Sequence, residues 1–150
     1  MLEIREKLVN LLDDLMINTG IISSSLITED GLIIATNSEQ NEQDEEININ
    51  FAAISASILS MAERGIEILN ANKNLEQIKI DAGFDKQTDE DFTIILTRVL
   101  SNILLQVIFP QKVNIGLIHF ETDKIINRIQ NQINNTSSRE GLLSSLGSLL

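Results

Sequence analysis

Hydrophobic residues recur at helical spacing near both ends of the 150-residue chain. This period predicts an amphipathic helix at the N-terminus, closed by Gly20, and a second one near the C-terminus, capped by Asn114. The repeating positions are Ile4, Leu8, Leu11, Leu12 and Leu15 in the first helix, and Ile115, Ile118, Thr122, Ile125, Ile126, Ile129 and Ile133 in the second.

Between these helices, shorter apolar segments predict five strands. Residues 21–28 and 32–36 flank Asp30-Gly31, a pair that tolerates the positive φ of a tight hairpin turn. Residues 75–82 alternate between apolar and polar, which indicates a half-covered edge strand. Residues 92–100 and 103–109 predict a second hairpin. The first and last of these strands are apolar on both faces, so both are expected to be central.

The middle of the chain differs from both ends. Residues 37–46 hold five acids and no base, and we expect a solvated loop there. The following segment predicts a helix from Asn48, as its cap, to Asn70. Its first half is uncharged and rich in small side chains, and a helix without a polar face must be buried or bind something. The small residues are Ala52, Ala53, Ser55, Ala56, Ser57, Ser60 and Ala62.

The expected element order is α-β-β-α-β-β-β-α. Strands joined by hairpins are antiparallel, so the prediction is an α/β protein of the α+β sandwich type with one five-stranded antiparallel sheet. The terminal helices are expected on one face and the middle helix on the other. Residues 1–133 form the predicted domain. Residues 134–150 are predicted to be a linker followed by a short amphipathic leucine tail.

Composition narrows the possible functions. The formal net charge is −11, the aromatic residues are five Phe, and there is no cysteine. The acidic balance and the shortage of aromatic side chains argue against nucleic acid as a partner. No uncharged stretch reaches the roughly 20 residues of a transmembrane helix. The N-terminus does not resemble a signal peptide, and we expect a cytoplasmic protein without disulfides.

The residues that carry enzyme chemistry are scarce. His119 is the single histidine, and no glycine-rich loop follows a strand to hold a phosphate. The acids at Asp81, Asp85, Asp89 and Asp91 lack the spacing of a calcium loop. We therefore expect no metal, no cofactor and no catalytic residues.

The ordered combination of segments resembles the Roadblock family of dynein light chains and small-GTPase regulators. The resemblance covers about residues 8–133. It rests on the leucine helix before "TGIISSSLITEDGLIIAT", on the small-residue middle helix, and on "VNIGLIHFETDKI", where Asn114 and Gly116 open the last helix. The long acidic segment before the middle helix and the tail depart from the usual pattern.

The resemblance implies a homodimer, or a heterodimer with a Roadblock paralogue, that binds a Ras-like small GTPase as a non-catalytic scaffold or regulator. Stimulation of the GTPase's own hydrolysis is compatible with this role. The expected dimer interface consists of Phe51, Ile54, Ser57, Ile58, Met61, Gln77 and Lys79. The expected contacts to other partners are Glu63, Arg64, Glu67, Leu142, Leu146 and Leu149. The simplest role of Arg64 is an i,i+3 ion pair with Glu67.

Two other functions fit the same pattern. One is a small-molecule sensing domain of profilin-like or PAS-like architecture, which needs a cavity with polar anchors. The other is a purely structural dimerising subunit of a motor or another complex. The predicted sheet faces are filled with Ile, Leu and Ser, which argues against the sensing domain, while the structural subunit stays compatible with the sequence.

Overall fold

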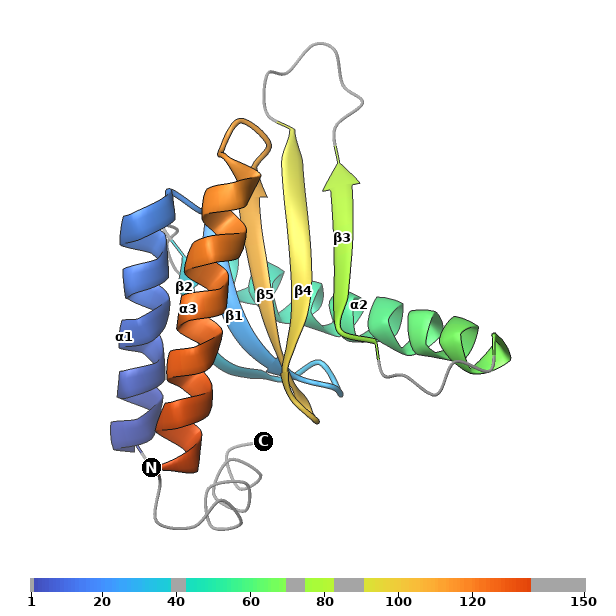
Figure 1. Ribbon diagram of the computed structural model, residues 1–150, viewed down its shortest axis with the longest axis horizontal. Coiled ribbons are helices and arrows are strands. Elements are labelled where there is room, and N and C mark those ends of the chain that lie inside the picture. The colour runs from blue at the N-terminus through green and yellow to red at the C-terminus, as the bar shows by residue number, and fades with distance from the viewer. Residues whose placement is uncertain (1, 39–42, 70–74, 83–90, 136–150) are drawn as a thin grey trace.

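The computed structural model describes residues 2–38, 43–69, 75–82 and 91–135. These residues form the expected order of three helices and five strands (Figure 1). The elements are α1 (Leu2–Thr19), β1 (Ser23–Thr28), β2 (Ile33–Ser38), α2 (Gln43–Ile68), β3 (Gln77–Ala82), β4 (Phe92–Leu100), β5 (Ile103–Pro110) and α3 (Ile115–Asn134). Of the helices described, none is long and apolar enough to cross a bilayer.

The five strands form one antiparallel sheet in the order β2-β1-β5-β4-β3. The predicted antiparallel α+β fold is therefore confirmed. β1 and β5 are far apart in the sequence but pair at the centre of the sheet, with Leu26 opposite Leu105. β3 forms one edge, as its alternation predicted, and β2 forms the other.

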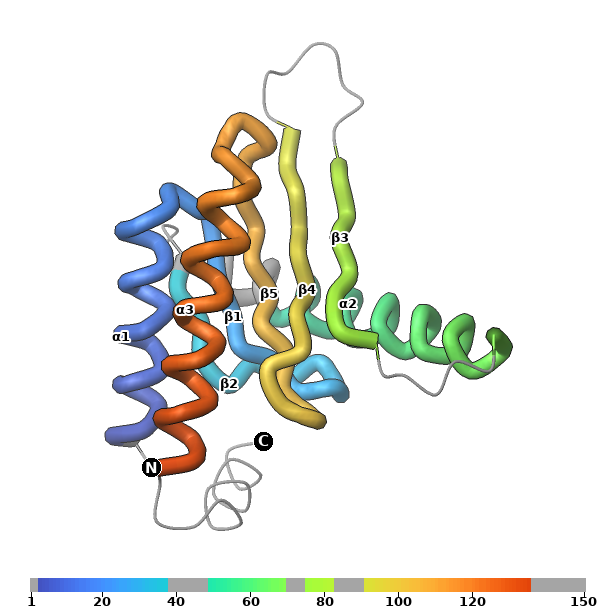
Figure 2. Tube along the Cα trace, viewed as in Figure 1, coloured from blue at the N-terminus to red at the C-terminus, as the bar shows by residue number. Residues whose placement is uncertain are grey.

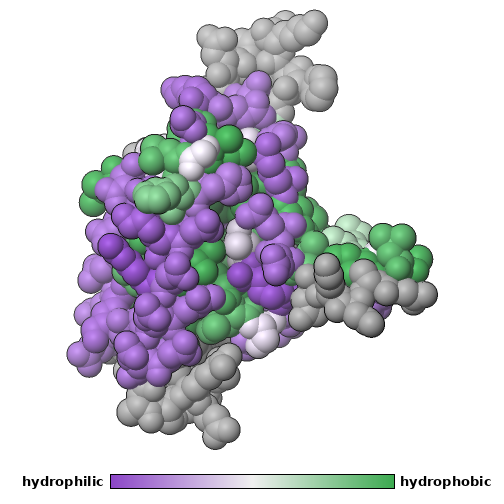
Figure 3. Space-filling view, in the orientation of Figure 1, coloured by the Kyte–Doolittle hydropathy of each residue, from purple (hydrophilic) through white to green (hydrophobic). Residues whose placement is uncertain are grey.

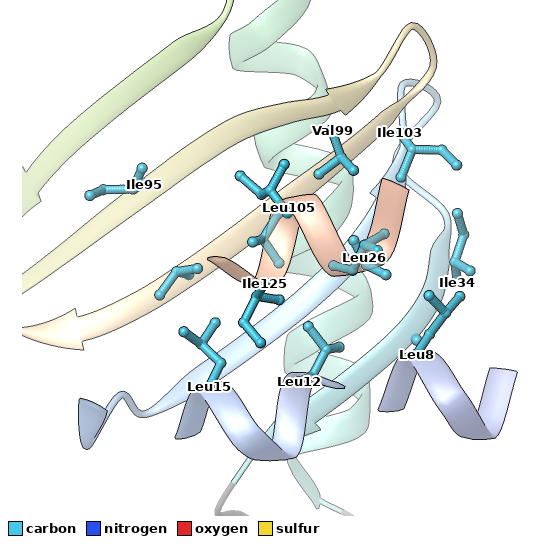
Figure 4. Packing of buried hydrophobic residues seen from close by; sticks show 14 of the residues in the cluster. Leu8, Leu12, Leu15, Leu26, Ile34, Ile95, Val99, Ile103, Leu105 and Ile125 are labelled. Carbon is cyan, nitrogen blue, oxygen red and sulfur yellow. The ribbon is translucent and has the colours of Figure 1, made fainter. Parts of the chain in front are cut away.

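The helices cover the two faces of the sheet unequally. α1 and α3 lie side by side on one face, and α2 crosses behind the strands on the other (Figure 1). The larger core lies between the sheet and the helix pair, where leucines of α1 meet Leu26, Leu105 and Ile125 (Figure 4). Behind the sheet, the buried apolar cluster is small and consists of Ile27, Ala52, Leu59 and Leu104.

Three local signals in the sequence are confirmed. Gly20 closes α1 with a φ of 74° and donates its N–H to Met16 O at 3.0 Å. Gly31 has a φ of 87° in the turn between β1 and β2. The Asn114 side chain caps α3 by accepting from the N–H groups of Gly116 and Leu117.

The predicted loop over residues 37–46 is wrong at residues 37, 38 and 43–46, while residues 39–42 lie outside the described residues. The predicted helix cap at Asn48 is also wrong. β2 continues to Ser38 because Asn37 and Ser38 pair with Ser24 and Ser23 of β1. The helix starts at Gln43, ahead of the acids at 44–46. Residues 43–46 therefore belong to the helix and not to the predicted loop.

Candidate interaction surface

The sheet-facing side of α2 is built from small residues and one polar link. Ala52, Ser55, Ala56 and Leu59 are buried at helical spacing. The Ser55 hydroxyl donates to the side-chain carbonyl of Gln106 on β5. Both side chains are buried, so this hydrogen bond satisfies two polar groups that would otherwise be costly under the helix.

The opposite side of α2 presents apolar side chains to solvent. Ile54 is 55% exposed and Met61 66% exposed. Ser57 is exposed between them, and its hydroxyl donates to the Ala53 carbonyl 3.1 Å away. Because that hydroxyl is satisfied within the helix, this face could be buried without leaving Ser57 unpaired. Phe51 and Ile58 flank it and are half-buried.

The end of α2 projects beyond the sheet. In the tube view, α2 passes behind β3 and continues past this edge strand (Figure 2). Ile68 is 82% exposed there, and Leu69 is similarly exposed. The space-filling view shows hydrophobic surface over this projecting end (Figure 3). The outward face of α2 is thus an apolar surface that its own sheet leaves uncovered.

The edge strand β3 adds a polar surface beside α2. Gln77 and Lys79 are both exposed. Gln77 donates to the Thr97 hydroxyl at 3.2 Å, and Thr93 donates to Asp81 at 2.8 Å. The Thr93 hydrogen bond is the main cause that lowers the pKa of the Asp81 carboxyl; desolvation opposes it, and Lys79 lowers the pKa further.

Arg98 on β4 links the sheet to α2 and to neighbouring turns, a role that the sequence pattern did not predict. Its side chain is 14% exposed, and it forms ion pairs with Glu29 at 2.8 Å and with Glu63 of α2. Its guanidinium also donates to the backbone carbonyls of Leu75 at 3.0 Å and Ser101 at 2.5 Å. The signal in the sequence is that Arg98 carries the one charge of the apolar strand FTIILTRVL.

The three charged residues expected on α2 therefore lie in different environments. Glu63 faces the sheet and is engaged by Arg98. Arg64 and Glu67 are exposed. The expected ion pair between Arg64 and Glu67 is not formed, because no acid within the described residues lies within 4.0 Å of Arg64. The tail residues Leu142, Leu146 and Leu149 lie outside the described residues, as does the predicted linker from residue 136 onward.

The described residues contain no group of three or more metal-binding side chains that could hold an ion. His119 is half-buried on α3. The chemistry that this surface can provide is burial of apolar area, backbone pairing along the β3 edge, and ion pairing through Arg64 and Glu67.

Comparison with solved structures confirms a Roadblock/LC7 fold. Myxococcus xanthus MglB superposes with a TM-score of 0.72 at 16% identity, over 85% of this chain and 95% of that one. Gliding protein MglB from Thermus thermophilus gives 0.70 at 12% identity, over 89% and 93%. A Roadblock/LC7 domain from Streptomyces avermitilis gives 0.70 at 12% identity, over 85% and 98%. No family model and no curated protein matches the sequence.

Proposed function

We propose that this protein is a dimeric, non-catalytic scaffold or regulator that binds a Ras-like small GTPase in the cytoplasm. The observation that carries the proposal is the outward face of α2, where Ile54 and Met61 are more than half exposed in a single chain. Water-exposed apolar side chains at helical spacing favour a protein partner over solvent.

A second copy, or a Roadblock paralogue, is the partner proposed for this face. The residues expected at the interface fall on two adjoining surfaces, with Phe51, Ile54, Ser57, Ile58 and Met61 on α2 and the Gln77–Lys79 pair on β3. An open edge strand offers unpaired backbone groups, so two β3 strands could extend the sheet across the dimer. Contact between two α2 helices, together with pairing of two β3 strands, is compatible with the roughly 1,600 Å² of surface that a standard protein interface buries.

The GTPase is proposed from the Roadblock resemblance and is supported by the shared fold. Arg64 and Glu67 remain exposed and are the proposed contacts on α2, together with the tail leucines. A rigid dimer of this kind would act by holding the GTPase's own residues in place.

Sedimentation equilibrium at micromolar concentration tests the dimer. We expect the wild type to be a dimer and Ser57→Arg to be a monomer, because the substitution buries an unpaired charge where two helices approach. Asn127→Arg is the matched control, since Asn127 is an exposed polar residue on α3, away from α2. A monomeric wild type, or equal effects of the two substitutions, would contradict the proposed interface.

Binding assays against Ras-like GTPases, each loaded with GDP or a non-hydrolysable GTP analogue, test the partner. We expect one GTPase to bind with a preference for one nucleotide state, and the chain alone to give a flat calorimetric titration with GTP and magnesium. A thermal shift with nucleotides or metabolites alone would favour the sensing alternative. Dimerisation without any GTPase binding would favour the purely structural role.

A further inference from the structure

The helix pair α1 and α3, on the face of the sheet opposite α2, carries an apolar surface where α1 ends and α3 begins (Figure 1). Ile17 lies in the last turn of α1 and is 79% exposed. Leu117 and Phe120 lie in the first two turns of α3, and Phe120 is 61% exposed. A hydrogen bond of 3.5 Å from Asn18 to Glu121 holds these turns side by side. We call Ile17, Leu117 and Phe120 the apolar end of the helix pair, and the space-filling view shows hydrophobic surface there (Figure 3).

Phe120 lies at the boundary between this apolar end and a polar stripe on α3. Lys124 Nζ is 5.6 Å from the centre of the Phe120 ring, so a cation already covers part of the ring. From Lys124 to the end of α3, the same outward face of the helix is polar and exposed. The residues at this helical spacing are Lys124, Asn127, Arg128, Asn131 and Asn134. The outward face of α3 therefore changes once along its length, from apolar to polar.

The amino-acid sequence that follows α3 has the same two parts in the reverse order. Residues 136–141, TSSREG, are polar or glycine, and the leucine tail at residues 142–150, LLSSLGSLL, carries no charge. Both segments lie outside the described residues. In a helix, the tail would have one apolar face, made of Leu142, Leu143, Leu146, Leu149 and Leu150. An isolated helix this short is marginal in water, so the leucine face needs a surface on which to pack.

The lengths of the two patterns agree. Phe120 precedes Asn135, the C-cap of α3, by 15 residues, which is about 22 Å along a helix. The seven residues from Asn135 to Leu142 span at most about 25 Å when they are extended. In a chain that turns back along α3, the polar linker would therefore run beside the polar stripe, and the leucines would begin near the level of Phe120. The rest of the tail, about 12 Å long as a helix, would then cover Leu117 and reach Ile17.

We propose that the leucine tail folds back along α3 of its own chain and packs on the apolar end of the helix pair. This contact removes apolar area of both surfaces from water. The short linker keeps the tail at a high effective concentration near its own α3, which favours it over a free partner. The inference goes beyond the proposed function, which assigns leucines of the tail to a GTPase: while no GTPase is bound, these leucines lie on the helix pair.

Paramagnetic broadening of NMR signals in the full chain tests this contact. Because the chain has no cysteine, Ser148→Cys introduces a single thiol, which carries a nitroxide on the polar side of the tail. We expect the amide signals of Leu117 and Phe120 to lose most of their intensity and to recover it when the nitroxide is reduced. Residues near Asn135 are broadened by the tether alone, whereas Phe120 lies about 22 Å from that point.

Two pairs of substitutions in the labelled chain separate docking from tethering. Phe120→Asp should restore most of the lost intensity at Leu117, because it places a charge in the apolar contact while replacing a side chain on which the core does not depend. Ile68→Asp is the matched control, since Ile68 is 82% exposed at the far end of α2, and the broadening should persist. Within the tail, Leu146→Asp should restore the signals, and Ser144→Asp, on the opposite side of the helix, should not.

Broadening that is equal in Phe120→Asp and Ile68→Asp would overturn the inference, and so would broadening centred on α2. A mixture of nitroxide-labelled chains with isotope-enriched chains that carry no nitroxide identifies the chain that supplies the tail. Broadening of Leu117 in the enriched chains of this mixture would mean that a second copy supplies it, which also overturns the inference. A GTPase that binds a protein without broadening at the helix pair would leave the proposed function intact and refute the docking of the tail alone.

Discussion

Replacing Arg98 removes the side chain that connects α2 to the sheet and to two turns. The Arg98→Met substitution keeps an unbranched apolar chain of similar reach in the strand while deleting the guanidinium. Four hydrogen bonds are lost, two of them to carboxylates and two to backbone carbonyls. The side chains of Glu29 and Glu63 are 45% and 38% exposed, so their carboxylates can be hydrated when the arginine is gone.

The expected cost follows from these four contacts. Loss of each of the two hydrogen bonds to a backbone carbonyl should cost about 1 kcal/mol of stability. Loss of each of the two partly exposed ion pairs should cost about 0.5 kcal/mol. The free energy of unfolding should therefore fall by roughly 3 kcal/mol. For a domain of this size, that loss lowers the melting temperature by about 10 °C. Arg98→Lys should fall between the wild type and Arg98→Met, because an ammonium keeps the charge but cannot fork to all four acceptors.

Urea unfolding followed by circular dichroism measures the loss. All variants should be compared at one protein concentration, since the stability of the proposed dimer would depend on it. Arg128→Met is the control, because its ion pair with Asp14 is half-exposed at 3.9 Å. We expect the control to stay within about 0.5 kcal/mol of the wild type. An Arg98→Met variant equally close to the wild type would refute the role assigned to this side chain.

Three further predictions concern single contacts. Gly31→Ala should destabilise the protein by more than about 2 kcal/mol, because the added Cβ would meet the α2 backbone. Gly20→Ala has nothing within 4 Å of the added Cβ and should cost about 1 kcal/mol for its positive φ alone. Thermal unfolding compares the two losses, and equal losses would contradict the close packing of the turn. Ser55→Ala leaves a buried glutamine carbonyl on β5 unpaired and should cost about 1–3 kcal/mol in urea unfolding, and no loss would mean that water replaces the hydroxyl. Thr93→Val removes a hydrogen-bond donor to the ionised carboxylate of Asp81, so the pKa of Asp81 should rise toward its ordinary value. An NMR titration measures this pKa, and an unchanged value would assign the lowering to Lys79.

Most of the fold could be predicted because its elements follow local rules. The leucine period of α1, the alternation in β3 and the glycine turn at Gly31 each depend on residues only a few positions apart. The boundary between β2 and α2 could not be predicted in this way. Ser38 belongs to β2 because it pairs with Ser23 of β1. The composition of the segment around Ser38 does not reveal this pairing.

The apolar sequence of the middle helix predicted a face that its own sheet would not cover, and the exposure of Ile54 and Met61 agrees with that prediction. The sequence alone did not determine which side each charge would take. Arg98 meets Glu63 across 35 positions and Glu29 across 69. Periodicity reports only which residues share a face of one element. Which faces of different elements meet is decided by tertiary packing. Only when the elements pack are charged side chains taken out of water, and burial of a charge is costly unless an opposite charge or a hydrogen bond compensates it.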